Sequence, residues 1–312
     1  RFDQRFVRLD AVLPVSRTLA VGGGIGYERI EISQRDPVVD AAGVPVVDND
    51  GRFVTNEAGP RRLAYQTDGI FWDAGVMWRP SARTTLEARV GQRFDATIYT
   101  GAFSWQMSSR SALAISVYNT IQSFGRGLND ALALLPTQFR TQPDVFGNQF
   151  GGCVFGVGGQ AGQCFSPVLN AINTANFRAR GVDAIVSAET TGGWQLGVGA
   201  GYAARDYLVP TAPVGASILF GVEDELYYVQ GFVGRNLGAR SAIALNAFGN
   251  LADSGLPGAP NVWGTGVNGS WIYNWNRIGA IASAGVFTSN IEGPGGEEAA
   301  AQAALALRYS FF

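Results

Sequence analysis

Hydrophobic and polar residues alternate along most of this chain with a period of two. Stretches of about ten residues carry an apolar side chain at every second position and end at Gly, Pro, Asn or Ser. Successive side chains of a β-strand point to opposite faces, so the pattern predicts strands with one apolar face. The apolar positions form thirteen stretches, at residues 7–13, 19–27, 70–78, 86–90, 99–105, 113–117, 182–188, 194–202, 227–233, 243–251, 267–275, 278–286 and 303–311.

The opposite phase of these strands is polar or small. Much of it is Gly, Ala, Ser and Asn, with charged residues at intervals. A soluble sandwich would need many more charges on its outer face, so this polar phase suits a lumen better than an outer surface. We therefore predict that the following charged residues line a lumen: Arg8, Asp10, Glu28, Asp73, Glu87, Arg89, Arg93, Asp183 and Arg205.

The composition agrees with a membrane protein. Charged residues are 15% of the chain and hydrophobic residues 46%, whereas soluble domains carry about 25% charged residues. The net charge of -2 gives no electrostatic reason to expect a nucleic-acid partner. A membrane-spanning helix needs about 20 consecutive apolar residues, and no stretch supplies them. The other structure that can cross a bilayer is a closed β-barrel.

The connections between the predicted strands alternate in length. Short turns, such as those at 14–17 and 190–193, alternate with mostly long segments, of which 34–62 and 125–173 are the longest; the exception is a tight turn near 95–97. Short periplasmic turns and long outer loops are typical of outer-membrane barrels. We therefore predict an all-β, antiparallel, up-and-down transmembrane barrel over residues 1–312, in the bacterial outer membrane, with the two longest loops extracellular.

The predicted number of strands is odd. Single-chain bacterial barrels normally have an even number. We therefore expect at least 14 strands in the intact barrel, and we expect residues 1–312 to be the C-terminal part of a longer chain.

Aromatic residues provide a further test of this interpretation. Outer-membrane barrels place rings of aromatic side chains at the bilayer interfaces. Five tryptophans lie in the apolar phase beside short turns, and two aromatic residues lie beside the C-terminus. We predict a periplasmic aromatic girdle formed by Trp78, Trp105, Trp194, Trp271, Trp275, Tyr309 and Phe311.

The two cysteines, Cys153 and Cys164, lie eleven positions apart in the second long loop. A close pair in an extracellular loop fits a structural disulfide, because disulfides persist in oxidising compartments. The chain has no histidine, which excludes Ser-His-Asp and Cys-His catalysis and histidine metal ligands. The acidic stretch 36–51 lacks the full spacing of a calcium loop. We expect no enzyme activity, no metal and no cofactor.

Glycine clusters at 22–26 and 197–201 superficially resemble phosphate-binding loops. A phosphate-binding fingerprint lies between a strand and a helix, whereas both clusters lie inside alternating strands. Their glycines fall on the lumen phase, where glycine marks strand bending or the close approach of another backbone. We favour barrel curvature over an inward-folded loop. The loop 125–173 either folds into the lumen or caps the barrel outside, and 129–135 fits a short helix within it.

The C-terminal segment Leu305-Ala-Leu-Arg-Tyr-Ser-Phe-Phe312 resembles the last strand of Gram-negative outer-membrane proteins. That resemblance implies recognition by the barrel-assembly machinery. The segments 26–36, 73–80 and 150–155 resemble an uncharacterised outer-membrane β-barrel family of alphaproteobacteria. Some members of that family are labelled as associated with a PEP-CTERM and exopolysaccharide system, and some as protein translocases. The resemblance covers most of the chain and assigns no binding residue.

Three functions fit the sequence. The first is a porin-like channel for small solutes or oligosaccharides, in which the charged residues form a selective path. The second is a non-conducting structural or assembly barrel that serves exopolysaccharide export or a surface complex, with the same charges packing the lumen. The third, a translocator with an upstream passenger, is disfavoured because residues 1–13 form a strand rather than a helix. The expected partners are the lipid bilayer, lipopolysaccharide and, as an alternative, a second copy of the chain.

Overall fold

The computed structural model of the chain describes residues 2–40, 46, 48, 54–94, 96–122, 128–129, 132–133, 135–139, 152–165, 176–208, 222–255, 260–291 and 296–309. Thirteen strands form one antiparallel sheet in which every strand pairs with its neighbours in the sheet order. The strands of this sheet are β1 Phe2–Pro14, β2 Leu19–Gln34, β3 Arg62–Ser81, β4 Thr84–Arg93, β5 Ala96–Ser108, β6 Ser111–Gln122, β9 Asn176–Glu189, β10 Trp194–Leu208, β11 Glu223–Asn236, β12 Ser241–Asp253, β13 Val262–Trp275, β14 Ile278–Ile291 and β15 Gly296–Tyr309.

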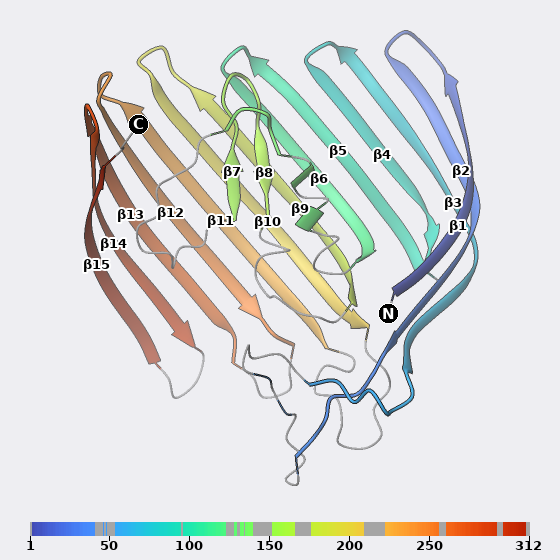
Figure 1. Cartoon of the computed structure of the whole chain (residues 1–312). Helices are drawn as coiled ribbons and strands as arrows, with labels where there is room; N and C mark the ends of the chain where they lie inside the picture. Colours follow the sequence, from blue (N-terminus) through green and yellow to red (C-terminus); the bar gives the residue numbers. More distant parts are fainter. Residues whose placement is uncertain are drawn as a thin grey trace.

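The sheet is an up-and-down meander that curves around a concave face (Figure 1). The short turns lie together at one end and the longer connections at the other. A separate hairpin, β7 (Cys153–Phe155) and β8 (Gly162–Cys164), belongs to the connection between β6 and β9. All thirteen predicted strands are present, and each is longer than or equal to its apolar stretch. Of the predicted helix 129–135, the described residues 129, 132 and 133 are helical, as is residue 128 just before it.

The register confirms the predicted phases. Apolar positions of neighbouring strands pair with each other, as in Leu9 with Ile25 and Ile25 with Trp72. The same holds farther along the sheet, where Val186 pairs with Val198. Paired residues share a face of the sheet. The predicted apolar phases therefore combine into one continuous surface.

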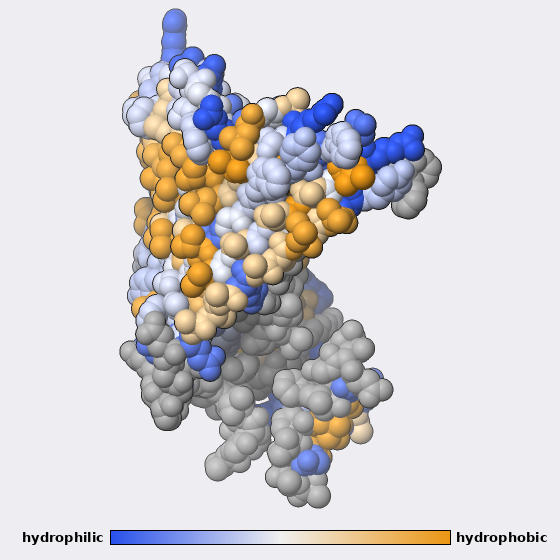
Figure 2. Space-filling view, turned by 90° about the vertical axis from the view of Figure 1, so that its left-hand side faces the viewer, coloured by the Kyte–Doolittle hydropathy of each residue, from blue (hydrophilic) through white to orange (hydrophobic). Residues whose placement is uncertain are grey.

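That surface is exposed. Large hydrophobic side chains such as Leu9, Ile70 and Leu307 are each more than 70% accessible. Figure 2 shows hydrophobic side chains gathered across the middle of the β15 side of the molecule, with hydrophilic ones near the end with the short turns. An exposed apolar area this extensive marks a surface that faces something other than water. Among the described residues, no helix has the length and apolarity needed to cross a membrane.

Aromatic residues border the apolar surface on both sides. Trp78, Trp105, Trp271 and Trp275 are exposed near the short turns. On the side of the long connections lies a row of tyrosines that the sequence analysis missed: Tyr27, Tyr99, Tyr202 and Tyr227.

The spacing between the two aromatic rows matches a bilayer. In β10, Tyr202 lies eight positions after Trp194, a distance of about 27 Å along a strand. At a tilt of roughly 40° this corresponds to about 20 Å of membrane thickness, close to the ~25 Å apolar band of such barrels. Assignment of the tryptophans to a periplasmic girdle stays a prediction, and Phe311 lies outside the described residues.

The sheet has two free edges. Among the described residues, β1 and β15 are not paired with each other, and they stand apart in Figure 1. Because thirteen strands alternate in direction, β1 and β15 run the same way. Direct closure would therefore need a parallel seam in an otherwise antiparallel sheet.

Candidate functional site

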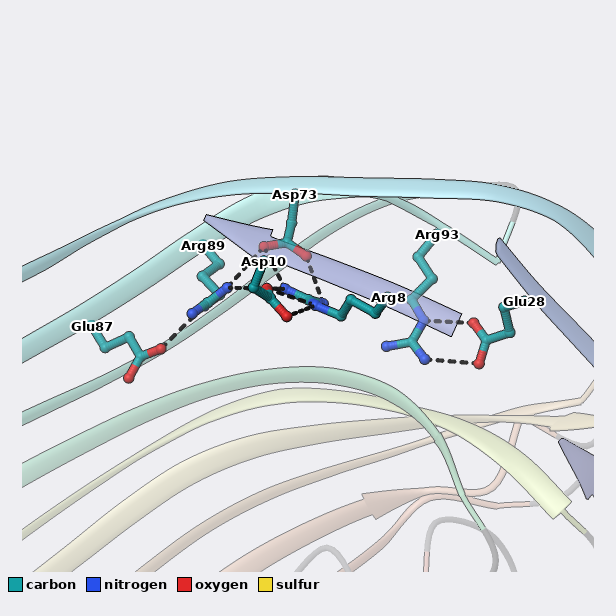
Figure 3. Close-up of polar contacts among 7 residues, drawn as sticks. All are labelled: Arg8, Asp10, Glu28, Asp73, Glu87, Arg89 and Arg93. Atoms are coloured by element: carbon teal, nitrogen blue, oxygen red, sulfur yellow. Dashed lines mark hydrogen bonds and ion pairs between the residues drawn. The ribbon is translucent and has the colours of Figure 1, made fainter. Parts of the chain in front are cut away.

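Seven of the nine predicted lumen residues come together on the concave face of β1 to β4 (Figure 3). We call them the charge ladder. They come from four strands: Arg8 and Asp10 from β1, Glu28 from β2, Asp73 from β3, and Glu87, Arg89 and Arg93 from β4.

Asp73 is the centre of the ladder. Its side chain is 7% exposed, and its two oxygens accept from Arg8 at 3.1 Å and 2.8 Å. Arg89 Nη1 donates to the same carboxylate at 3.0 Å. Two guanidinium groups therefore share one buried carboxylate, an arrangement that satisfies its acceptors and draws three strands together.

Two further carboxylates flank this centre. Arg8 Nε donates to Asp10 at 2.8 Å, and Arg89 Nε donates to Glu87 at 3.1 Å. The side chains of Asp10 and Glu87 are about half exposed, at 51% and 47%, whereas Arg8 and Arg89 are mostly covered. These two flanking carboxylates are therefore more exposed than the guanidinium groups that they pair with.

A second ion pair lies nearer the long connections. Arg93 donates to both oxygens of Glu28, at 2.7 Å and 2.8 Å, and Gln4 Nε2 also donates to Glu28. The Arg93 guanidinium lies 4.9 Å from the ring centre of Phe71 and 4.8 Å from that of Phe94. The fork geometry and the two rings fix the orientation of Arg93.

Glycines opposite the charged residues make this packing possible. Arg8 pairs with Gly26, Asp10 with Gly24, and Gly75 with Arg89. A Cβ at Gly24 would lie 2.6 Å from Arg8 Nη2. The long side chains therefore lie flat against bare backbone.

The hairpin β7–β8 packs on a different part of the concave face, against β9, β10 and β11. The predicted disulfide between Cys153 and Cys164 is present. Both sulfur atoms sit over Gly199, where a Cβ would lie 2.7 Å from Cys153 Sγ and 3.0 Å from Cys164 Sγ. Phe155 covers Gly197 in the same way. The preference for barrel curvature was wrong at these two glycines, because they seat a second layer of chain.

Further contacts fix the hairpin to the wall. The Cys153 N–H donates to Gln230 Oε1 at 2.8 Å, Ser187 Oγ donates to the Ala161 carbonyl, and the Phe155 and Phe232 rings stack with centres 5.9 Å apart.

The hairpin tip extends toward the short turns. A Cβ at Gly159 would lie 3.1 Å from the Ser109 carbonyl, in the turn between β5 and β6. Within the connection between β6 and β9, the described residues 152–165 therefore fold inward along the wall, as the inward-folding alternative predicts for this part of the loop.

The last two predicted lumen residues lie on β9 and β10, apart from the ladder. Asp183 accepts from Ser116 Oγ at 2.6 Å and is buried. Arg205 donates to Asp224 at 2.8 Å and 2.5 Å, and Tyr207 donates to the same carboxylate at 2.7 Å. Each residue has its own partners, so the structure divides the predicted set between two parts of the concave face.

Apolar side chains gather where the sequence pattern predicts a polar lumen. Ile30 and Ile32 of β2 are fully buried and pack with Ile121 of β6 and, at its margin, with Leu208 of β10. The strand ends of β2 and β6 therefore meet near the long connections. Alternation alone could not reveal this contact, because it joins strands that are not neighbours in the sheet.

The described residues contain no group of three or more Asp, Glu, Cys or His side chains placed to hold a metal ion.

Comparisons with known proteins found distant structural similarity. No family model matches the chain, and no curated protein matches it. One similar solved structure is OmpT, an outer membrane protein of Vibrio cholerae, which is 10% identical over 99% of this chain and 95% of that chain, with a TM-score of 0.35. A second is the outer membrane channel DcaP of Acinetobacter baumannii, which is 13% identical over 98% of this chain and 84% of that chain, with a TM-score of 0.38. A third is a bacterial polysaccharide outer membrane secretin, which is 11% identical over 98% of this chain and 79% of that chain, with a TM-score of 0.34.

The fold itself defines the class. An antiparallel meander with an exposed apolar band, aromatic borders and a polar concave face is the architecture of outer-membrane β-barrels. The chain is therefore an outer-membrane β-barrel protein of bacteria. The resemblance to the alphaproteobacterial family, with its exopolysaccharide labels, stays a prediction.

Proposed function

We propose that the protein is a passive channel for small polar solutes, with no catalytic role. The observation that carries the proposal is the position of the β7–β8 hairpin. It is stapled by a disulfide and lies against β9 to β11, so it narrows the space inside the sheet without crossing it. A fixed inward loop on one wall and a row of charges on another are the elements of a selective constriction.

The ladder sets the charge of this path. Three arginines, Arg8, Arg89 and Arg93, face four carboxylates, so the seven residues carry a net charge of -1. The two carboxylates that reach farthest into the open are Asp10 and Glu87. We therefore expect weak cation preference, since exposed rings of acidic groups attract cations.

The path needs a closed wall. We propose that at least one further strand lies between β1 and β15 in the intact barrel, because an even number lets every pair stay antiparallel. Lipopolysaccharide at the outer surface, the barrel-assembly machinery and a second copy of the chain remain expected partners.

A second candidate function is a non-conducting structural or assembly barrel, linked to exopolysaccharide export or a surface complex. The burial of Ile30 and Ile32 favours it, because buried apolar side chains in the lumen phase of β2 obstruct a water-filled path.

Conductance in planar bilayers separates the two functions. The wild-type protein is expected to give steady single-channel currents, and Arg89→Glu is expected to increase the permeability ratio of cations to anions. Arg5→Glu is the matched control, because Arg5 is an exposed arginine of β1 outside the ladder. A folded, heat-resistant protein that stays silent supports the structural role. Replacing residues 128–165 with a short Gly-Ser linker then shows whether the inward loop is the obstruction.

A further inference from the structure

The concave face of β11 to β14 is chemically unlike the charge ladder. Strands β13 and β14 contain no Asp, Glu or Arg, and β12 contains only Asp253 at its end. Instead, a group of buried amides and hydroxyls covers this part of the sheet, and we call it the neutral wall. Its members are Gln230, Asn246, Asn268, Ser270 and Ser283, each more than 90% buried.

Hydrogen bonds orient one side of the neutral wall. The Cys153 N–H of the hairpin donates to Gln230 Oε1 at 2.8 Å, and Gln230 Nε2 donates to Asn246 Oδ1 at 3.0 Å. The hairpin therefore fixes the direction of these amides. Asn246 pairs in register with Asn268 of β13, so the amides continue across the sheet.

The other side of the neutral wall has unused hydrogen-bonding capacity. Asn268 Oδ1 and Ser283 Oγ are buried and have no hydrogen-bond partner within the described part of the chain. Asn268 pairs with Gly285, two positions from Ser283 on the same face of β14. Buried polar atoms nearly always have partners, so two orphans on one face point to a group that is supplied from outside.

Aromatic rings stand beside these atoms. Phe248 of β12 and Phe287 of β14 have ring centres 6.3 Å apart. Both lie against Gly266, where a Cβ would be 2.6 Å from Phe248 and 2.7 Å from Phe287. A Cβ at Gly285 would likewise meet Phe287 at 2.9 Å. The glycines let the rings lie low against the backbone, so that the rings form a half-buried apolar platform on the concave face.

We infer that the neutral wall is a binding site for an uncharged, polyhydroxylated solute, a sugar ring or a short oligosaccharide. A sugar combines an apolar face of C–H groups with a rim of hydroxyls, which matches aromatic rings beside amide and hydroxyl groups. Asn268 Oδ1 accepts from a sugar hydroxyl, and the Ser283 hydroxyl donates to or accepts from another. Binding sites commonly combine an apolar surface with a few convergent polar groups in this way.

The same features disfavour other ligands. A phosphate or carboxylate would find no cation among the described residues of β12 to β14, and a purely apolar ligand would leave both orphan atoms unpaired. This inference names the class of solute that the proposed channel would carry. Transport of the sugar rests on the proposed channel function, whereas binding of the sugar does not. Binding itself can be measured without conductance.

The test measures sugar binding to the purified full chain. Glucose, galactose and mannose oligomers of one to six units are titrated into the bilayer chamber, and polyethylene glycol of equal size serves as the non-binding control. We expect a saturable block of the current by at least one sugar series. Asn268→Ala is expected to weaken that block about tenfold, as the loss of one hydrogen bond predicts.

Two further variants separate recognition from folding. Ser283→Ala changes little volume and is expected to weaken sugar binding severalfold, whereas Val286→Ala, on the outward face of the same strand, is expected to leave it unchanged. Phe287→Ala is expected to weaken longer sugars more than single units. Equal affinities for wild type, Asn268→Ala and Ser283→Ala would overturn the inference, as would an absence of saturable block by any of the sugars.

A silent protein calls for a second readout. Isothermal titration calorimetry with the same sugars and the protein in detergent then decides the question. Binding that Asn268→Ala weakens would retain the neutral wall as a sugar site while the channel function fails. No heat of binding from any series would reject the site as well.

Discussion

Two rows of glycines on the concave face look alike in sequence, but different groups pack against them. The row at Gly22, Gly24 and Gly26 lies beneath the charge ladder, where the atoms nearest Gly24 are the ends of the Arg8 and Asp10 side chains. The row at Gly197 and Gly199 lies beneath the hairpin, and its nearest atoms belong to a ring and a disulfide. Gly24 of the first row makes room for the flexible ends of two side chains, whereas Gly197 and Gly199 of the second row make room for a separate, rigid layer of chain.

This difference predicts that the two rows tolerate substitution of glycine by a larger residue to different extents. Gly199→Val has the largest expected effect, because its Cβ would lie 2.7 Å from Cys153 Sγ and the stapled sulfur cannot turn away. We expect the hairpin to leave the wall, at a loss of more than about 3 kcal/mol. The rate at which a water-soluble phosphine reduces the disulfide measures this and should rise at least roughly tenfold.

Gly231→Val is the matched control for that measurement. Gly231 is a glycine of β11 in the outward phase, where it pairs with Val198 and Ala247, and the atom nearest to an added Cβ, the Gly197 carbonyl oxygen, would be 4.0 Å away. Equal reduction rates in Gly199→Val and Gly231→Val would contradict the seating of the hairpin on Gly199.

Removing the disulfide of the hairpin is expected to have the next largest effect. The double change Cys153→Ser and Cys164→Ser opens a loop with a sequence separation of 11 residues and should destabilise the hairpin by about 3 kcal/mol. Proteolysis at the tip, near Gly158 and Gly159, is the measurement. The global unfolding midpoint of the sheet should change little, and a collapse of the whole sheet would show that the hairpin is part of the barrel core.

Within the ladder, Asp73→Asn removes the carboxylate that Arg8 and Arg89 share. We expect a loss of about 2 kcal/mol, because each arginine keeps at least one other acidic partner. Urea titration of the folded protein in micelles checks the loss. The net charge of the ladder rises by one, so reversal potentials should move toward anions, and an unchanged potential would place the ladder outside the ion path.

Gly24→Ala has the smallest expected effect. Arg8 Nη2 and Asp10 Oδ1 lie nearest to the added Cβ, and both are ends of side chains that can shift. Alanine also lowers the conformational entropy of the unfolded chain, so the stability should stay within about 1 kcal/mol of the parent. A loss in Gly24→Ala as large as that in Gly199→Val, measured by the same urea titration, would remove the distinction between the two rows.

Much of the fold could be predicted from sequence because side-chain alternation reports directly on the two faces of a strand. The phase of Leu9, Ile25 and Trp72 was sufficient to place all three on one surface, and the register joins them there. The tyrosine row escaped notice because its members lie beside connections of varied length, so no repeated turn type marked Tyr99 or Tyr202 as a border.

The site could be predicted only in part. Alternation identified the ladder residues but not their partners, since the contact between Arg93 and Glu28 spans 65 positions. The strands that the hairpin packs against could not be predicted for the same reason, because the contact between Cys153 and Gln230 spans 77 positions. The neutral wall was missed because Asn246 and Asn268 were interpreted only as filler of the polar phase, and an unpaired buried atom is visible only in three dimensions.

The inward position of the hairpin also constrains biogenesis. Its tip lies against the turn between β5 and β6, while its base lies on strands made later in the chain. A loop seated this deeply has to enter before the wall seals around it, because afterwards the two openings of the barrel are the only entrances. We therefore expect the disulfide, which gives the hairpin its compact shape, to form before the wall closes.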